Sequence, residues 1–452
     1  MLGLNASLSL ASQALQAQDG AIGITSNNIA NVNTAGYSRQ VVNLSAEALS
    51  QNGGSVGSGV SFGGYTSVRD QLLQISINTK AAQGASLDTQ SSALTQIQTA
   101  FSGTDSGIGA AMSALFSNLS SLSSNPTDAS ARQSALSSAS QLANAFHQGS
   151  AALTNAGSAG DALVSSSVAQ INQLTKQIAS LNGQIQSLTG AGHEGGSIED
   201  QRDELTGQLA QLTGIAHTGT EGQPTLTTGN GSPLVIGDKA YALQVSTGTD
   251  GLQHVFDASG SDVTKALSGG SLGGALTTRD ITVPGLLTQL NTLATQFASA
   301  INTAQSAGFD AAGAAGQPMF TVSATDASAS FSVALSSNSG IAVSSDGSAG
   351  SSGNLANLLA VRTAKLASGE TPIDSYANLV AKIGSSASDA ATKLTATKLS
   401  LSQLNNLQSS TTGVSIDEES TNLIRYQQAY TAAAHVISTV NSLFTVVMNM
   451  GQ

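Results

Sequence analysis

Apolar residues at the two ends of this 452-residue chain recur at alternating steps of four and three, and this repeat constrains the fold more than any other feature. Such spacing places side chains on one stripe of an α-helix. The first stripe comprises Leu4, Leu8, Leu15, Ile22, Ile29 and Val32. The last comprises Leu423, Tyr426, Tyr430, Ile437, Val440, Phe444 and Val447. Both ends are therefore predicted to be long helices, each with a seam that packs against protein.

The C-terminal helix has a predicted starting point and very little charge. Ser415, with Glu418 three residues later, forms the pattern of a capping box. After Arg425 the chain contains no Asp, Glu, Lys or Arg, and the first 46 residues contain only Asp19 and Arg39. A solvated surface helix normally carries a charged face, so these helices are expected to contact protein on several sides. The alternative is a buried helical hairpin within one domain.

Further helical repeats predict a mainly α fold of long antiparallel helices. They span residues 171–188, 286–304 and 390–404. Three regions interrupt them: 41–65, predicted as a β hairpin around Gly53 and Gly54; 216–279, rich in Thr, Gly and short β-prone runs; and the Ser/Gly-rich stretch 319–353.

These patterns suggest three structural units. The first is a coiled-coil-like terminal domain of residues 1–40 and 412–452. The second is a helical body of residues 41–215 and 280–411, and the third is a small inserted outer β domain, 216–279. The ends of the insert are expected to lie close together, and its removal is expected to leave the body folded.

Composition argues against several classes of function. The 15 basic and 27 acidic residues give a net charge of -12, which disfavours a nucleic-acid partner. The absence of cysteine excludes disulfides, thiolate metal sites and cysteine nucleophiles. No apolar run approaches the roughly 20 residues that span a bilayer, so no membrane insertion is expected. The first basic residue is Arg39, so no cleavable secretory signal is expected either.

No motif predicts catalysis, a metal site or a cofactor. His193 and Glu194 supply only the first two letters of a zinc-protease helix. The glycines at 53–59 and 269–274 lack the lysine of a phosphate-binding loop and are interpreted as turns. Asp200, Arg202 and Asp203 admit a catalytic acid pair, but helix-start capping and a local salt bridge are favoured. An enzyme is therefore the weaker hypothesis. The remaining histidines are widely separated: His147, His217, His254 and His435.

Residues 27–40, NNIANVNTAGYSRQ, resemble the N-terminal signature of bacterial flagellar rod, hook and hook-associated proteins. The matching positions are Asn27, Asn28, Asn31, Asn33, Gly36, Tyr37 and Arg39. The YSRQ ending is most similar to the hook-associated protein 1 family, the hook–filament junction proteins. The similarity continues through GVSF (59–62), VRD (68–70), NPTDASARQ (125–133), INQLTKQIASLNGQI (171–185), EDQRDEL (199–205), SLGGALTTRD (271–280) and the segment 413–450.

This resemblance implies a secreted structural subunit of the extracellular flagellum, without enzymatic activity or cofactors. Such subunits are exported unfolded by the flagellar type III apparatus and assemble through their terminal helices into a ring between hook and filament. The implied partners are the hook protein, the second junction protein or flagellin, and an export chaperone at the C-terminal helix. Many relatives carry a larger outer insertion than 216–279. The alternatives are another axial protein of hook, rod or filament type, or a secreted adhesin.

Overall fold

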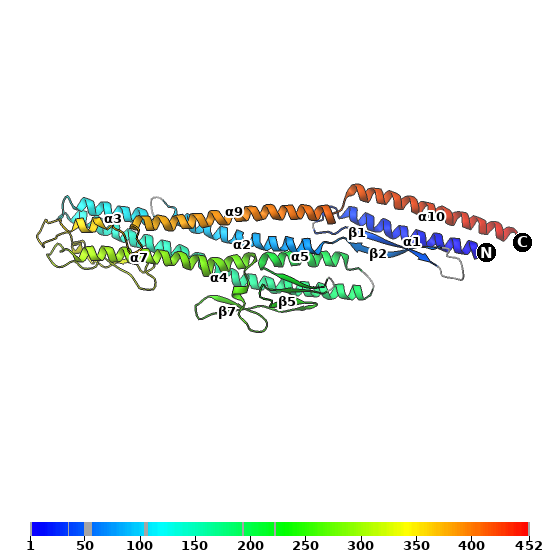
Figure 1. Ribbon diagram of the computed structural model, residues 1–452, viewed down its shortest axis with the longest axis horizontal. Coiled ribbons are helices and arrows are strands. Elements are labelled where there is room, and N and C mark those ends of the chain that lie inside the picture. The colour runs from blue at the N-terminus through cyan, green and yellow to red at the C-terminus, as the bar shows by residue number, and fades with distance from the viewer. Residues whose placement is uncertain are drawn as a thin grey trace.

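The protein is an elongated, mainly helical molecule whose two termini lie at the same end (Figure 1). The computed structural model describes residues 2–34, 36–48, 57–103, 107–191, 194–220 and 223–450. The predicted class, long helices with small β additions, is confirmed. The exact boundaries of the three predicted units remain a prediction.

Both ends of the chain build what we call the terminal unit. Its elements are α1 (Leu2–Ala30), β1 (Gln40–Ala48), β2 (Gly57–Ser67) and α10 (Ile416–Met450). α10 lies along one side of α1, and the antiparallel pair β1–β2 lies along another side (Figure 1). Gly20 of α1 leaves room for Phe62 of β2, because a Cβ there would lie 2.8 Å from the phenyl ring. Gly53 and Gly54, where the hairpin was predicted to turn, lie outside the described residues.

Long helices form the body. They are α2 (Gln71–Phe101), α3 (Ile108–Leu122), α4 (Ala129–Gly190), α5 (Gly196–Leu212), α7 (Val283–Ser306), α8 (Leu355–Ala360) and α9 (Pro372–Thr412). α2 and α9 run side by side from the terminal unit into the body (Figure 1). Asp70 and Asp128 start α2 and α4 as N-caps, since their carboxylates accept hydrogen bonds from free N–H groups of the first turn.

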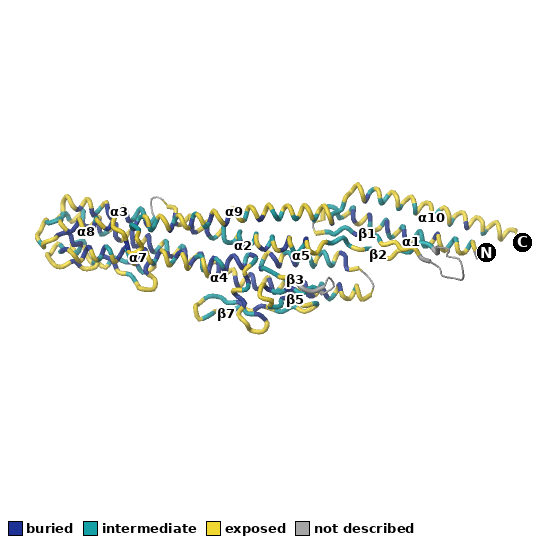
Figure 2. Tube along the Cα trace, in the orientation of Figure 1, coloured by how far each residue is buried: buried dark blue, intermediate teal, exposed yellow. Residues whose placement is uncertain are grey.

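The largest cluster of buried apolar residues lies at the end of the body far from the termini (Figure 2). Phe146 and Phe331 stack there with ring centroids 4.6 Å apart. The loops that cover this core contain only β9 (Phe320–Thr321), β10 (Ser332–Val333) and a 3₁₀ turn (Asn338–Gly340). Hydrogen bonds from helix side chains, rather than a larger sheet, hold these loops in position. Asn302 of α7, for example, donates to the Phe320 carbonyl at 2.7 Å and accepts from the Met319 N–H at 2.8 Å.

The outer β region packs directly on α4. It contains a four-stranded antiparallel sheet of β3 (Ala216–Thr220), β4 (Gln223–Thr227), β5 (Pro233–Ile236) and β6 (Lys239–Ala240). A separate hairpin consists of β7 (Gln244–Thr247) and β8 (Gln253–Phe256), and a 3₁₀ turn (Thr264–Ala266) follows. Leu226, Val235 and Val255 of these strands share one buried core with Val164 and Ile171 of α4. The expectation that the body would fold without 216–279 conflicts with this packing.

The chain enters this region at Gly214 and leaves it at Gly269, and the backbones of these two glycines are in contact. The ends of the β excursion therefore lie close together, as expected. Residues 270–282, however, are helical rather than β: α6 (Gly270–Thr277) continues into a π turn (Thr278–Thr282). α6 packs against both α2 and α4. Gly270 has the left-handed φ of +66° that suits a turn, as expected. Gly273 and Gly274, also interpreted as turn residues, instead lie inside α6 where the backbones of Ser268 and Ser86 approach closely.

A matched pair of glycine substitutions tests this close packing. A Cβ on Gly274 would overlap the backbone carbonyl of Ser86 on α2, whereas a Cβ on Gly285 of α7 would meet no atom within 4 Å. We expect Gly274→Ala to lower the free energy of unfolding by about 1–3 kcal/mol, because helix backbones must move apart. Gly285→Ala should be neutral or stabilising by up to about 1 kcal/mol. Urea unfolding of both variants measures the difference, and equal stabilities would contradict the packing.

Candidate functional site

Several motifs that are far apart in the sequence meet where the terminal unit joins the body. We call this cluster the polar joint. Its members are Asn28, Tyr37, Ser38 and Arg39 from α1 and the following loop, Arg69 before α2, Glu199, Asp200 and Asp203 from α5, and Glu418 and Glu419 from the first turn of α10.

Asn28 is the buried centre of the polar joint, with 1% of its surface exposed. Its Oδ1 accepts hydrogen bonds from the Tyr37 hydroxyl at 2.8 Å and from the Gln40 N–H at 3.0 Å. Its Nδ2 donates to the Gln40 carbonyl at 2.8 Å and to Glu419 Oε2 at 3.1 Å. A side-chain amide has two donors and two acceptor sites, so every one is matched. Asn28 therefore connects α1, the start of β1 and α10.

Arg39 connects the same loop to α10 through charge. Its Nε lies 2.8 Å from Glu419 Oε1, and its Nη1 lies 2.9 Å from Glu418 Oε2. Its backbone N–H donates to the Thr412 carbonyl at 3.1 Å, and its own carbonyl accepts from the Val68 N–H at 2.8 Å. Because Glu419 is only 3% exposed, its carboxylate requires this pairing to be tolerated inside the protein.

Arg69 joins the hairpin side of the terminal unit to α5. Its guanidinium nitrogens lie 2.7 Å from Asp200, 2.8 Å from Asp203 and 3.2 Å from Glu199. Nη2 also donates to the Gly196 carbonyl at 2.7 Å. The planar fork of an arginine suits several acceptors at once, which a single ammonium group does not. Arg69 thus gathers three acidic side chains of the body around one residue of the terminal unit.

Ser38 links the two arginine clusters through Asp200. Its hydroxyl donates to Asp200 at 2.8 Å and its backbone N–H donates to the same carboxylate at 3.2 Å. Burial raises the pKa of Asp200, while the Arg69 charge and the Ser38 hydrogen bonds oppose that rise. Burial, together with the negative charge of Asp200, raises the pKa of Tyr37 to about 12. Tyr37 therefore remains a neutral hydroxyl donor to Asn28 at physiological pH.

The conservative substitution Arg69→Lys tests whether the forked guanidinium of Arg69 is needed to hold α5. It keeps the positive charge but removes most of the donors that reach α5, so we expect a loss of about 1–2 kcal/mol in the free energy of unfolding. Arg425→Lys is the control, because Arg425 is exposed and donates to Asn422 alone among the described side chains. Thermal melting of both variants measures the effect. A shift in Arg425→Lys as large as in Arg69→Lys would show that the fork is not special.

The structure brings the two predicted seams together within one chain, because α1 and α10 pack side by side. Val440 is buried, with 5% exposed, while Tyr430 and Val447 are exposed by 39% and 42%. The remaining seam residues are half-buried: Leu4, Leu8, Leu15, Ile22, Ile29, Val32, Leu423, Tyr426, Ile437 and Phe444. The two helices that carry the seams are thus in contact within one chain. That these residues also contact other subunits stays a prediction.

A second stripe on α10 has the same spacing and is uncovered. This stripe is hard to detect in the sequence because two of its members are alanine and threonine. We call it the second seam: Ala432, Val436, Thr439, Leu443, Val446 and Met450, all exposed. Val436, Leu443, Val446 and Met450 are exposed by 45%, 47%, 52% and 82%. At 100° per residue this stripe is turned about 120° from the seam that faces α1.

The other family-motif residues shape the turn after α1. Asn31 donates to the Asn27 carbonyl at 3.0 Å and accepts from the Thr34 hydroxyl at 3.1 Å. Gly36 has a φ of +77°, a left-handed conformation that glycine adopts without strain. Asn33 is exposed. These residues therefore serve the turn that delivers Tyr37 and Arg39 to the polar joint.

Two local predictions from the sequence need correction. α5 begins at Gly196 with Gly195 as N-cap, so Asp200 lies beyond the helix start and does not cap it. The expected local bridge is present, with Arg202 Nη2 3.0 Å from Asp203 Oδ1. At α10 the Ser415 hydroxyl accepts from the Glu418 N–H at 3.5 Å, which is half of the predicted capping box. The Glu418 carboxylate turns to Arg39 instead of closing the box.

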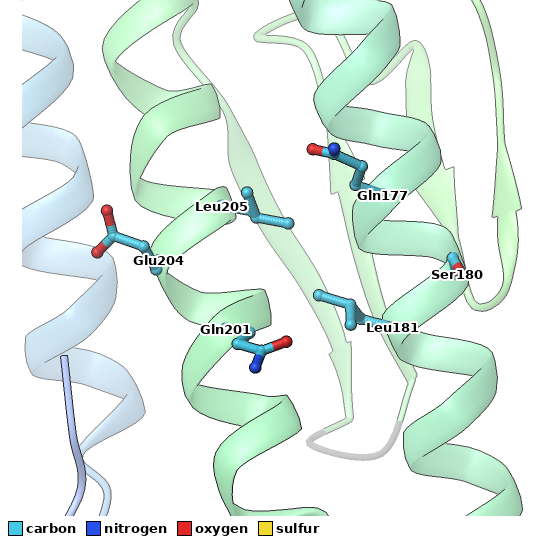
Figure 3. Close-up of a pocket in the computed structure, with 6 residues that line it drawn as sticks. All are labelled: Gln177, Ser180, Leu181, Gln201, Glu204 and Leu205. Carbon is cyan, nitrogen blue, oxygen red and sulfur yellow. The ribbon is translucent and has the colours of Figure 1, made fainter.

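A groove of about 400 Å³ lies beside the polar joint, between α4 and α5 (Figure 3). Leu181 and Leu205 point toward one another across it. Gln177, Ser180, Gln201 and Glu204 complete the lining, which gives no pairing of nucleophile and base. Among the described residues no group of three or more His, Cys, Asp or Glu side chains could hold a metal ion. His193 lies outside the described residues.

One stretch meets the length and mean hydropathy of a membrane span, which the search for long apolar runs in the sequence had not indicated. Between Pro372 and Met450 an 18-residue window has a mean hydropathy of 1.4, and 6% of it is buried. A single such helix is weak evidence for a membrane span. The same composition is expected of a helix that lacks charges because it packs against protein.

Comparison with known families places the chain among flagellar proteins. Residues 8–37 match the flagella basal body rod protein family, and residues 409–450 match the C-terminal family of the flagellar basal body rod FlgEFG proteins. These matches cover α1 and α10 of the terminal unit. The fold and its terminal unit therefore define a structural protein of the bacterial flagellum.

A match within the body identifies a particular family within this class. Residues 94–320, half of the chain, match the flagellar hook-associated protein FlgK helical domain. The chain belongs to the flagellar hook-associated protein FlgK family. The predicted family is thereby confirmed.

Individual relatives are similar in sequence to this chain along nearly its whole length. Flagellar hook-associated protein 1 of Escherichia coli is 29% identical over 535 aligned positions, covering 96% of this chain and 98% of that protein. The same protein of Bacillus subtilis is 29% identical and covers 98% and 97%. Since 535 positions exceed the 452 residues here, the E. coli relative has insertions that this chain lacks. The flagellar hook junction protein FlgK from Burkholderia pseudomallei shares the fold, with a TM-score of 0.68, 19% identity and coverage of 74% of this chain and 100% of that one.

Proposed function

We propose that this chain is the subunit that joins hook to filament and that it assembles there through its terminal unit. The observation that carries the proposal is the exposed, nearly uncharged α10. Of its 35 residues, only Glu419 and Val440 are buried within the chain. The exposed face carries large apolar side chains and no formal charge after Arg425. A helix of this kind gains stability when neighbouring subunits cover it.

The polar joint gives this assembly surface a fixed direction. Arg69 holds the terminal unit to α5, and the Arg39 N–H holds it to the end of α9. Asn28 and the Arg39 side chain fix α10 against α1 and its following loop. A rigid joint lets contacts made by α1 and α10 determine where the body stands in the assembly. The proposal therefore assigns assembly to the terminal helices and orientation to the joint.

The proposed route and partners follow from the family. The subunit leaves the cell unfolded through the flagellar type III apparatus, without cleavage of a signal, and forms a ring. On one side the ring meets the hook protein, and on the other side it meets the second junction protein or flagellin. Before export a chaperone covers α10, whose apolar surface would otherwise be exposed in the cell.

Placing a carboxylate on the uncovered face of α10 tests the proposal. Leu443 is 47% exposed, so Leu443→Asp should leave the melting temperature of the monomer within a few degrees of wild type. In the assembled ring the same carboxylate would be buried without a partner, which costs several kcal/mol. We expect cells that carry only this variant to secrete the subunit and to lack filaments.

Leu163→Asp is the matched control, because Leu163 lies on α4 of the body and is similarly exposed, by 42%. Swimming assays, electron microscopy of flagella and the amount of subunit in the medium are measured together. Retention of Leu443→Asp inside the cell would indicate that the chaperone contact failed. Normal filaments with Leu443→Asp would contradict assembly through α10.

A further inference from the structure

We infer that the second seam of one subunit packs against the β1–β2 hairpin of a neighbouring copy of the same chain. The inference rests on the proposed function and specifies which faces meet. It begins from the distribution of exposed apolar side chains over the terminal unit. On α10 the second seam supplies Val436, Leu443, Val446 and Met450.

Outside α10, the exposed large apolar residues of the described terminal unit gather on the hairpin side. Val41, Leu44 and Phe62 belong to β1 and β2 and are exposed by 42%, 39% and 40%. Leu10 of α1, exposed by 42%, lies beneath the hairpin, since a Cβ on Gly59 would lie 3.1 Å from its side chain. The hairpin side is therefore the apolar surface available to receive the second seam.

The two surfaces match in length and in charge. The second seam extends over 18 residue steps from Ala432 to Met450, or about 27 Å at 1.5 Å per step. The nine residues of β1 extend over about 30 Å at 3.3 Å per residue. The second seam has no charged residue, and the described strands contain Glu47 as their one charged residue. A helix lying along a two-stranded sheet is a common way to bury both apolar faces.

The two surfaces lie on different sides of α1, so the second seam of one subunit cannot pack against the hairpin of that same subunit. α10 covers the seam side of α1, while Leu10, Gln13 and Gly20 face the hairpin. Figure 1 shows α10 and the hairpin on opposite sides of α1. A contact between unlike faces on opposite sides repeats from copy to copy, and it closes into a ring when the rotation allows. The surface placement thus favours a repeating assembly of copies over an isolated dimer.

Disulfide trapping in assembled flagella tests this contact without background, because the chain has no cysteine. The double variant Leu443→Cys with Leu44→Cys is expressed as the only copy of the protein in the cell. Flagella are then isolated and oxidised, and their proteins are separated on a non-reducing gel. Disulfides form only when the two Cα atoms approach within about 7 Å. We expect a ladder at multiples of 44.9 kDa, extending beyond the dimer.

Single variants identify which faces are in contact. Each single cysteine alone should stay monomeric, whereas co-expression of Leu443→Cys and Leu44→Cys on separate copies should give dimers. Leu163→Cys with Leu44→Cys is the control and should give no ladder. Val436→Cys with Val41→Cys repeats the test at a second site in case the first pair disturbs assembly.

Other occupants of the second seam give different results. Dimers from Leu443→Cys alone would mean that two α10 helices meet, and a fast-migrating monomer would mean that the faces meet within one chain. Binding of purified protein to phospholipid vesicles, lost in Leu443→Asp, would assign the seam to lipid if no ladder forms. Each of these outcomes overturns the pairing. Absence of wild-type subunit from isolated flagella would instead overturn the proposed function itself.

Discussion

Asn28→Asp is expected to open the polar joint and to loosen α1 from α10 and β1 within the terminal unit. The new carboxylate would face Glu419 Oε2 and the Gln40 carbonyl, where Asn28 now donates two hydrogen bonds. Leaving a charge buried without a partner costs about 3–5 kcal/mol, a large fraction of the stability of a domain. We expect this loss in the terminal unit, with the distant aromatic core around Phe146 and Phe331 unaffected.

Hydrogen exchange measured segment by segment shows where the structure opens. Residues of α1 and α10 should exchange at least 100-fold faster in Asn28→Asp than in wild type, since 1.4 kcal/mol corresponds to a factor of ten. Asn27→Asp is the control, because Asn27 is adjacent but exposed. An equal change in both variants, or none in Asn28→Asp, would show that the buried amide does not hold the joint.

Deletion of residues 215–268, with Gly214 and Gly269 joined by a short Gly/Ser linker, is expected to abolish cooperative melting. The linker can close because these glycines already touch. The deletion nevertheless uncovers Val164, Ile171 and Ile178 of α4, which are buried in the core shared with the strands. Losing the burial of this core removes on the order of 10 kcal/mol of apolar stabilisation.

A compensated deletion tests whether exposed apolar surface, rather than another effect of the deletion, causes the loss of cooperative melting. The same deletion with Ile171→Gln and Ile178→Gln places polar side chains on the uncovered face of α4. If exposure causes the failure, the compensated chain should regain solubility and melt as a cooperative unit, as judged by circular dichroism and size-exclusion chromatography. Cooperative melting of the uncompensated deletion at the wild-type temperature would show that the β region is an independent insert.

Periodicity in the sequence predicted the terminal helices but not what covers each face. Neighbours on α10 illustrate the reason: Ile437 is half-buried in the predicted seam, while Val436 is exposed in the second seam. Both residues satisfy a repeat of steps of four and three. The repeat fixes which side chains share a stripe, whereas the partner of that stripe depends on tertiary packing.

The polar joint shows a second limit of sequence reasoning. The motifs around Asn28, Arg69, Asp200 and Glu419 were each recognised, yet their meeting was not predicted. Arg69 and Asp200 are separated by 131 residues, and nothing local specifies that they pair. A signal was nevertheless present, because charged residues are rare in this chain, 9% in all, and these short motifs contain several of them. Rare charges that lie within motifs are candidates for mutual pairing.

Gly273 and Gly274 were misinterpreted as turn residues for a related reason. Turns and close helix crossings both select glycine, and the sequence alone does not distinguish the two uses. The structure decides the matter at Gly273 and Gly274, where an added Cβ would overlap the backbone of Ser268 and Ser86. The helix that results, α6, is the element that ties the β region to α2 and α4.

Electron cryomicroscopy of intact flagella at the boundary between hook and filament would show directly whether the subunits assemble through their terminal units. We expect a ring of this chain at that boundary, with the terminal units of neighbouring copies in contact along the inside and the β3–β8 region facing outward. The second seam should be covered by protein, and the polar joint should be intact in each subunit. A ring held together by contacts of the body, with α10 uncovered, would contradict assembly through the terminal unit.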